Sequence, residues 1–240
     1  MADISKITLP SGQTYNIKDA TLRAAFAKGL TLKAAVSFSK SVVDFSSTDK
    51  AVTINVKLSS STEDSAALAQ DGNFSNGAVK GVCDGVSTQT LSGTGFTLSQ
   101  SYTFTAVGEL GVTPSGTAQY LGTAVTFNGG RGSVHAVLPS YIGYVDDISN
   151  FSSALSTHFT KLVKHSLDGS YSVQNSYSAA AKMVIAVPKN GNVLAVSKIV
   201  QHGTLDAEQQ FTKDTTTSTS YDFYICNTRH NPGTYTFIIS

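Results

Sequence analysis

Five histidines are the residues in this chain best suited to ligating a metal or transferring protons. They are His135, His158, His165, His202 and His230. His158 and His165 fall about two turns apart on one face of a predicted helix. Joint ligation would need a third group between them, and Lys161 stands in that place. We therefore expect no metal site there, and assign these side chains to exposed or helix-terminal positions.

Carboxylates and hydroxyls could act in hydrolysis, and two adjacent acids occur at Asp146-Asp147. Neighbouring acids in a loop more often cap a helix, and no distant carboxylate stands out as their partner. The serine-rich stretches contain no GxSxG motif, and Gly93-Thr94-Gly95 does not complete GxGxxG. Asp71-Gly72-Asn73 lacks the acidic spacing of a calcium loop. The sequence predicts a protein that is not an enzyme and binds no cofactor.

The two cysteines, Cys83 and Cys226, are far apart in the sequence. A small secreted domain held by disulfides would contain more of them. We expect two buried or half-exposed thiols in a protein made in a reducing cytosol, and their redox state stays open.

Tyrosine is the remaining residue type that could form a binding site, because its ring can stack on a sugar or anchor an interface. The chain has 10 tyrosines and no tryptophan. Tyr141, Tyr144, Tyr221 and Tyr224 lie near the ends of predicted strands. Packing is the first interpretation, and Tyr141 and Tyr144 are kept as possible contacts for a cell-surface glycan.

The composition indicates strands and turns as the elements that position these residues. Only 14% of the residues are charged, and serine, threonine and glycine fill the polar positions instead. The net charge of +1 favours neither nucleic acid nor an anionic membrane. No apolar run reaches about 18 residues, and Asp3, Lys6 and Pro10 interrupt the N-terminus. We expect no membrane insertion and no export by the ordinary secretory route.

The first thirty residues differ from the rest. Short alternating runs flank Pro10-Ser11-Gly12, which predicts a hairpin, and a helix with Asp19 at its start and Gly29 past its end follows. Such an element is too small to bury a core of its own. We predict that residues 1–30 form a docking and oligomer-interface segment. Its contact residues are Ile4, Ile7, Leu9, Pro10, Gly12, Tyr15, Ile17, Leu22 and Phe26.

The remaining chain predicts two β domains. Residues 31–130 contain short alternating strands separated by glycine-rich turns, the pattern of an Ig-like β-sandwich. The glycine-rich run at 128–132 predicts the boundary. Residues 131–240 predict a second β-rich domain with one helix near 147–165 and a hairpin of 182–187 with 193–200. The fold class is therefore mainly β, with an N-terminal hairpin-plus-helix segment.

The run ISKITLPSGQTYNIKDA at 4–20 resembles a segment found at the start of head-fibre and tail-fibre proteins of tailed bacteriophages. It covers under a tenth of the chain. Residues 31–127 resemble Ig-like modules of phage virion proteins. Residues 131–240, with AVPKNG at 186–191 and GTYTFII at 233–239, resemble β-rich modules of gut phage proteins.

The resemblance implies a particle-docking N-terminus, outward-facing distal domains, a trimer and no catalytic residues. The chain departs from long fibres, since it has no collagen-like repeat and no long heptad helix. A short spike or decoration protein fits better than an extended shaft.

The expected function is that of a non-enzymatic structural protein of a phage virion, assembled in the host cytoplasm. Head fibre or capsid decoration is the first alternative, with residues 1–30 docked on capsid, portal or tail proteins. A tail or baseplate receptor-binding protein, contacting a glycan, is the second. The third is a depolymerase, which should show a long repetitive β-helix and a carboxylate cluster, and the sequence shows neither.

Overall fold

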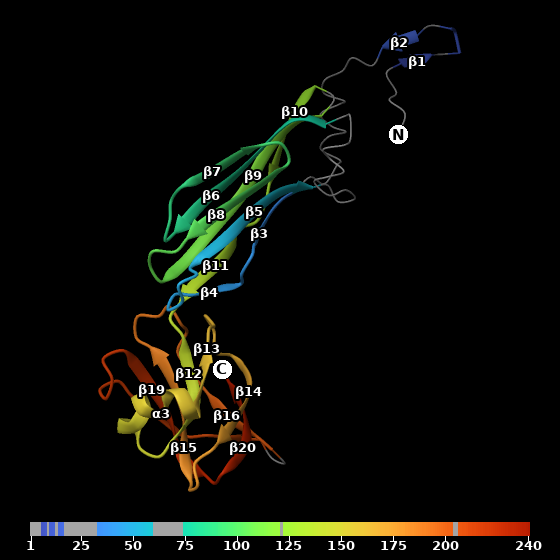
Figure 1. Cartoon of the computed structure of the whole chain (residues 1–240). Helices are drawn as coiled ribbons and strands as arrows, with labels where there is room; N and C mark the ends of the chain where they lie inside the picture. The colour runs from blue at the N-terminus through green and yellow to red at the C-terminus, as the bar shows by residue number, and fades with distance from the viewer. Residues whose placement is uncertain are drawn as a thin grey trace.

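The computed structural model is built mainly from strands, as the composition predicts (Figure 1). It describes residues 6–8, 10–12, 14–16, 33–59, 74–120, 122–203 and 206–240. Near the N-terminus, β1 (Lys6–Thr8) pairs antiparallel with β2 (Thr14–Asn16), with Pro10 and Gly12 exposed in the turn. The predicted helix that follows, with Leu22 and Phe26, lies outside the described residues. No helix in the described ranges is long and apolar enough to cross a membrane.

The first unit consists of two sheets. The larger has the strand order β4 (Val42–Asp44), β11 (Gly132–Val137), β9 (Gly108–Tyr120), β6 (Phe74–Gly85) and β7 (Thr90–Thr94), with β10 (Thr123–Asn128) also paired to β9. The smaller has the order β3 (Lys33–Phe38), β5 (Ala51–Ser59) and β8 (Thr97–Thr103). The pairing is antiparallel except between β4 and β11, which run parallel.

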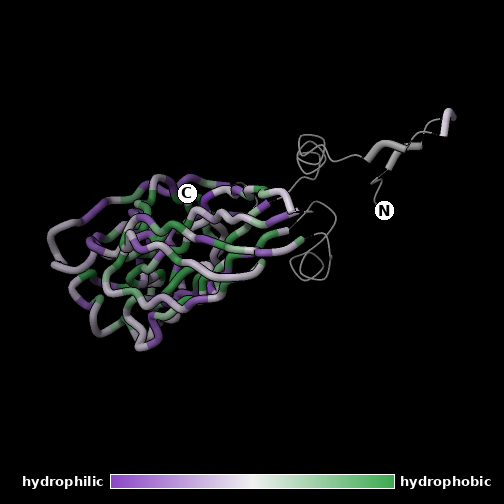
Figure 2. Tube along the Cα trace, turned by 90° about the horizontal axis from the view of Figure 1, so that it is seen from above, coloured by the Kyte–Doolittle hydropathy of each residue, from purple (hydrophilic) through white to green (hydrophobic). Residues whose placement is uncertain are grey.

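Alternation along the strands places the core of the first unit between these sheets. Along β5, Val52, Ile54, Val56 and Leu58 are buried while the residues between them are more exposed. A Cβ atom at Gly81 of β6 would lie 3.4 Å from Val56, so the sheets meet directly there. Figure 2 shows apolar segments running inside the bundle of strands.

The second unit also has two sheets. One has the order β13 (Phe159–Leu162), β12 (Ser140–Val145), β15 (Ala181–Pro188), β19 (Tyr221–His230) and β18 (Phe211–Asp214). The other has the order β14 (Gly169–Asn175), β20 (Gly233–Ile239), β16 (Ile199–His202) and β17 (Ala207–Glu208). A 3-10 turn, η1 (Ile148–Asn150), leads into the helix α3 (Phe151–His158).

The central strand β15 is apolar throughout because both of its faces are covered. Met183 and Ile185 pack into the core between the two sheets. Val184 and Ala186 point to the other side, where they pack with Phe151 of α3. A strand covered on both faces reads as a continuous apolar run.

The chain passes from the first unit to the second later than the predicted boundary at 128–132. β11 pairs with β9 and β4 of the first unit, so the chain passes to the second unit only at Leu138-Pro139. The glycines mark close packing instead of a linker. A Cβ at Gly129 would overlap the carbonyl oxygen of Ala34, and one at Gly132 would lie 2.7 Å from Val36.

Two other predictions for the second unit were wrong. The helix expected over 147–165 ends at His158, because residues 159–162 form β13 and pair with β12. The segment 193–200 does not form a hairpin with β15, since β16 pairs with β20 and β17. In both cases a long-range strand pairing overrides the local pattern.

The chain enters and leaves the first unit at opposite ends. β3 begins at Lys33, which pairs with Ser59 at the end of β5. β11 ends at Val137, which pairs with Asp44 beside the second unit. The two units therefore follow one another along an elongated molecule (Figure 1). Any segment preceding Lys33 joins the end farthest from the second unit.

Candidate functional site

The two tyrosines predicted as glycan contacts have different environments. Tyr144 is fully buried between the sheets of the second unit, so it cannot contact a glycan. Burial raises the pKa of its phenol above the usual range. Tyr141 is half-buried on the opposite face of β12, where it packs edge-on against Phe151 and Tyr221. Burial and the neighbouring Tyr141 raise the pKa of Tyr221 to about 12.

The predicted docking residues are placed only in part. Ile7 and Tyr15 are paired across β1 and β2. Pro10 and Gly12 lie in the exposed turn, and Gly12 has a φ of 79°. The other five lie outside the described residues: Ile4, Leu9, Ile17, Leu22 and Phe26.

Both cysteine thiols are buried and free. Cys83 lies in the first unit and Cys226 in the second. Burial raises the pKa of Cys83 and raises that of Cys226 to about 12. A thiol that stays protonated is a poor nucleophile and a poor metal ligand.

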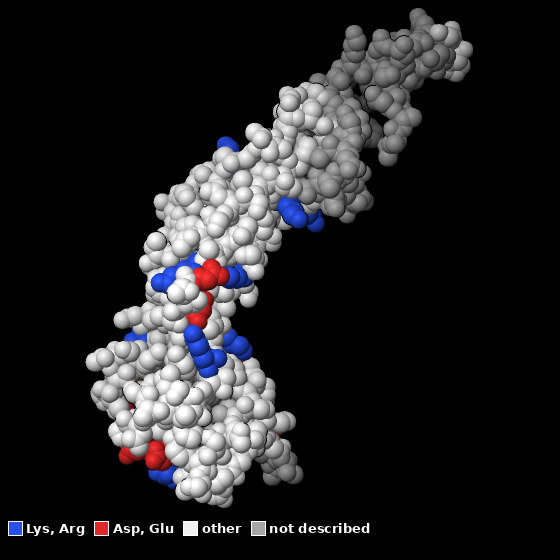
Figure 3. All heavy atoms as spheres, in the orientation of Figure 1, with Lys and Arg blue, Asp and Glu red and all other residues white. Residues whose placement is uncertain are grey.

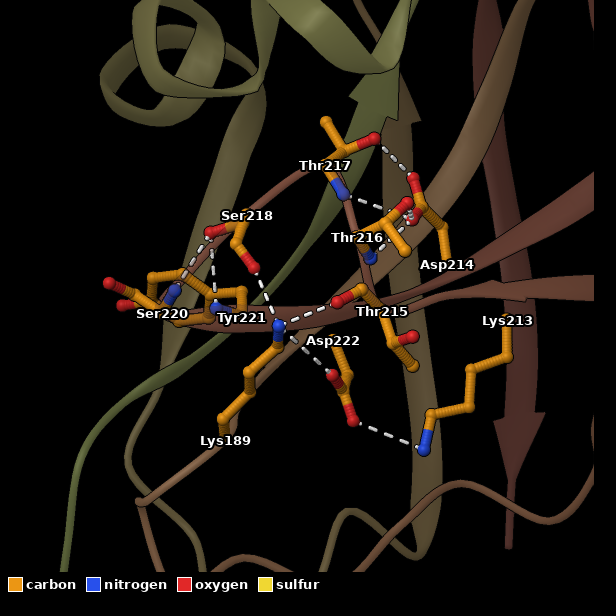
Figure 4. Close-up of polar contacts among 10 residues, drawn as sticks. All are labelled: Lys189, Lys213, Asp214, Thr215, Thr216, Thr217, Ser218, Ser220, Tyr221 and Asp222. Carbon is orange, nitrogen blue, oxygen red and sulfur yellow. Dashed lines mark hydrogen bonds and ion pairs between the residues drawn. The ribbon is translucent and has the colours of Figure 1, made fainter.

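A threonine-rich loop after β18 closes over the ammonium group of Lys189 (Figure 4). Lys189 Nζ donates to the carbonyl oxygens of Thr215 at 2.6 Å and Ser218 at 2.7 Å. Asp222 lies 3.9 Å from it and also pairs with Lys213 at 3.1 Å. The lysine therefore holds the loop in place and is not available to a ligand.

The hydroxyls of this loop are also engaged. Thr216 and Thr217 donate both backbone and side-chain hydrogen bonds to the carboxylate of Asp214 (Figure 4). These bonds, led by that from the Thr217 hydroxyl, lower the pKa of Asp214. An ionised carboxylate that accepts four such bonds stabilises a turn, so this cluster has a structural role.

An open groove lies between α3 and the loop that follows β14. We call it the α3 groove, and its volume is about 220 Å³. It is lined by Asp146, Asn150, Ser153, Ala154, Thr157, His158 and Tyr177. α3 buries Phe151 and Ala154 and leaves Ser153 and Thr157 exposed, which makes the groove wall polar.

The aromatic end of the α3 groove is held rigidly. The rings of His158 and Tyr177 are stacked with centroids 4.0 Å apart, and His158 Nδ1 lies 2.7 Å from Ser176 Oγ. Tyr177 N–H donates to Asn175 Oδ1 at 3.1 Å. The buried Asn175 in turn donates to the carbonyl oxygen of His230 at 2.8 Å. These contacts position the stacked pair before any ligand arrives.

Asp146 supplies the charge of the α3 groove. Its Oδ1 accepts hydrogen bonds from Asn150 Nδ2 at 3.3 Å and from the N–H of Asp147 at 2.8 Å. These bonds, that of Asn150 first, lower the pKa of Asp146, so it is a hydrogen-bond acceptor and not a general acid at neutral pH.

A second depression of about 220 Å³ shares Asp146 with the α3 groove. Its lining is Val145, Asp146, Asp147, Ile148, Lys182, Ile225 and Arg229. Arg229, one of these lining residues, donates to the carbonyl oxygens of Asp146 at 3.1 Å and Ala180 at 2.8 Å. In the described part of the chain, no three histidine, cysteine, aspartate or glutamate residues are grouped to hold a metal.

Sequence reasoning singled out Asp146, Asp147 and His158 but did not bring them together with Tyr177. Asp147 caps the 3-10 turn η1 by accepting from Ser149 N–H at 2.9 Å, whereas the N-cap of α3 is Asn150, which makes no side-chain capping bond. No pattern in the sequence marks Tyr177 as part of this groove, because only the fold of the loop after β14 brings it against α3.

His230 is expected to make the second unit sensitive to acid. It is buried, with Nε2 3.0 Å from Gln201 Oε1, and burial lowers its pKa. The unfolded chain binds this proton more readily, so stability is lost as the pH falls below about 6.5. Unfolding of the second unit at neutral and acidic pH measures the effect, which we expect to be at most about 1.4 kcal/mol per pH unit for this group.

The matched variants are His230→Gln, which removes the buried titrating group, and His202→Gln, which removes an exposed one paired with Asp206. A flatter pH profile is expected only for His230→Gln. Equal profiles for the wild type and both variants would contradict the assignment.

Comparison with protein-family models, with curated protein sequences and with solved structures found no match to this chain.

Proposed function

We propose that this chain is a non-enzymatic structural protein of a bacteriophage virion, a head fibre or capsid decoration protein. Residues 1–30 dock on other virion proteins, and the two β units face outward. The observation that carries the proposal is the direction in which the chain runs along the molecule. The chain enters the first unit at Lys33, at the end farthest from the second unit, so an N-terminal anchor leaves both units free to project (Figure 1).

The strand order of the first unit supports its proposed Ig-like character. The order β3-β5-β8 against β4-β11-β9-β6-β7 matches an Ig-type arrangement in which the first strand divides between the two sheets. Its second half, β4, runs parallel to the last strand, β11. Consecutive strands β7 and β8 lie in different sheets, so the chain crosses from one sheet to the other between them.

The surface supports a display role without catalysis. Figure 3 shows a face that is mostly uncharged, with Lys, Arg, Asp and Glu gathered near the waist of the molecule. The hydroxyls of Thr216 and Thr217 bond the carboxylate of Asp214, and the thiols of Cys83 and Cys226 are buried. A trimer joined through residues 1–30 would display three copies of this surface.

Imaging of the particle tests this proposal. Density for two β units in series is expected, with the first unit nearest the attachment point and residues 1–30 in contact with the capsid. The number of copies at each site gives the symmetry. Attachment through the second unit, or absence from the particle, would overturn the proposal.

A tail or baseplate receptor-binding protein is the second candidate, and the α3 groove favours it. Its stacked pair, carboxylate, amide and hydroxyls are the groups that recognise a saccharide. For this second candidate, the protein is expected to bind selected glycans on an array, and Tyr177→Ala should weaken that binding at least about tenfold. The control is Tyr120→Ala, a half-exposed tyrosine of the first unit. No selective binding, or equal loss in both variants, would reject this candidate.

A further inference from the structure

The two units are joined at a contact surface that carries two histidine rings. His135 of β11 stacks on His165 of the second unit, with centroids 3.8 Å apart and planes inclined by 9°. Beside the stack, Lys161 Nζ of β13 pairs with Asp44 Oδ2 of β4 at 2.6 Å. Near the linker, Leu138 N–H donates to the carbonyl oxygen of Gly191 at 3.3 Å. The contacts come from both units and fix their relative orientation.

Asn192 determines which ring nitrogens carry protons. His165 Nδ1 lies 2.7 Å from the carbonyl oxygen of Asn192, which can only accept, so this nitrogen is protonated. The Asn192 amide lies 3.4 Å from His135 Nδ1 and donates to it. His135 must therefore be neutral, with its proton on Nε2, for the whole arrangement to form.

We propose that the His135–His165 stack is a pH-sensitive latch that fixes the two units in one orientation at neutral pH and releases them in acid. Protonation of His135 at Nδ1 removes the acceptor that the Asn192 amide uses. It also places a positive charge face to face with a second imidazole. Both effects weaken the contact between the units without requiring either core to open.

The groups around His135 shift its pKa in both directions. Burial, the facing His165 and Arg131 lower its pKa, whereas Glu109 raises it. Glu109 lies directly opposite His135 on β9 and is itself paired with Arg131 at 2.8 Å. On β4 the residue opposite His135 is the apolar Val42.

The direction of the pH effect follows from the lowered pKa. A histidine that resists protonation in the closed junction stabilises it above the ordinary histidine pKa of about 6.5, and this stabilisation is lost as the pH falls. Burial acts to raise the pKa of Asp44, but hydrogen bonds from Lys161 and Ser46 lower it overall. Asp44 therefore stays ionised at about pH 5, and the acid response is assigned to the stack and not to the Asp44–Lys161 pair.

Double electron–electron resonance on the full-length protein tests the latch, because it measures the distance between a spin label on each unit. Labels at Lys80→Cys in the first unit and Thr234→Cys in the second lie on exposed positions. The native cysteines are buried and do not compete for labelling. A single narrow distance distribution is expected at about pH 7.5 and a broadened one at about pH 5, with circular dichroism showing both units folded.

The variant His135→Gln keeps an acceptor for Asn192 but cannot be protonated, so its distribution should stay narrow in acid. His202→Gln is the control and should broaden like the wild type, because His202 is exposed and pairs with Asp206. An unchanged wild-type distribution across this pH range overturns the proposal, as does equal broadening in His135→Gln. If that variant does not fold, the test is an NMR titration of His135 in the wild type. Its pH midpoint should coincide with that of the broadening, and two different midpoints would overturn the proposal.

Discussion

Replacing Phe237 with alanine is expected to lower the free energy of unfolding of the second unit by about 3–5 kcal/mol. The ring is fully buried on β20, in the core between the two sheets, and packs edge-on against His230. Removal of the ring leaves a cavity that the flanking strands can only partly close. Denaturant unfolding followed by NMR signals of each unit measures the loss.

The matched control for Phe237 is its neighbour on the other face of the same strand. Ile238 is 39% exposed, so Ile238→Ala should cost less than about 1 kcal/mol. The first unit has separate core clusters and should unfold as in the wild type in both variants. Equal losses at the two positions, or an equal shift of the first unit, would show that the core is assigned wrongly.

Gly143→Ala should destabilise the second unit by about 2–3 kcal/mol through overpacking. Gly143 lies on the face of β12 that α3 covers. An added Cβ would overlap the backbone oxygen of His158 and lie 2.8 Å from the Cα of Phe159. Backbone atoms at the turn from α3 to β13 cannot move aside as a flexible side chain could.

Gly130→Ala is the control for this prediction, because an added Cβ there meets no atom within 4 Å. Its effect should stay within about 0.5 kcal/mol, as for an ordinary surface position. Thermal unfolding of both variants provides the comparison. A Gly143→Ala protein as stable as Gly130→Ala would mean that α3 does not pack against β12.

The β class and many strands could be predicted because period-two alternation is a local signal. β5 shows it most clearly, with four buried residues alternating with more exposed ones. The same signal could not separate Tyr141 from Tyr144, since nothing in the sequence says which face of β12 meets the other sheet. The structure buries Tyr144 and leaves Tyr141 beside α3.

The errors in the predicted boundaries have a common physical cause. The glycine-rich run at 128–132 predicts a flexible link, whereas in the structure Gly129 and Gly132 allow β3 to approach the neighbouring strands closely. Similarly, Gly191 packs against Pro188 and Leu138 at the junction of the units. Close approach between distant segments leaves no local pattern, so the junction and the α3 groove could not be predicted.

Deletion of residues 2–29 tests the central claim most directly. The shortened protein should be soluble, with both β units unfolding as in the full-length chain, because the buried apolar residues of the described ranges run from Ala34 to Ile239. When it is produced together with the other virion proteins, it should be absent from purified particles that contain the full-length chain. Incorporation of the folded, shortened protein at the full-length level would contradict the account.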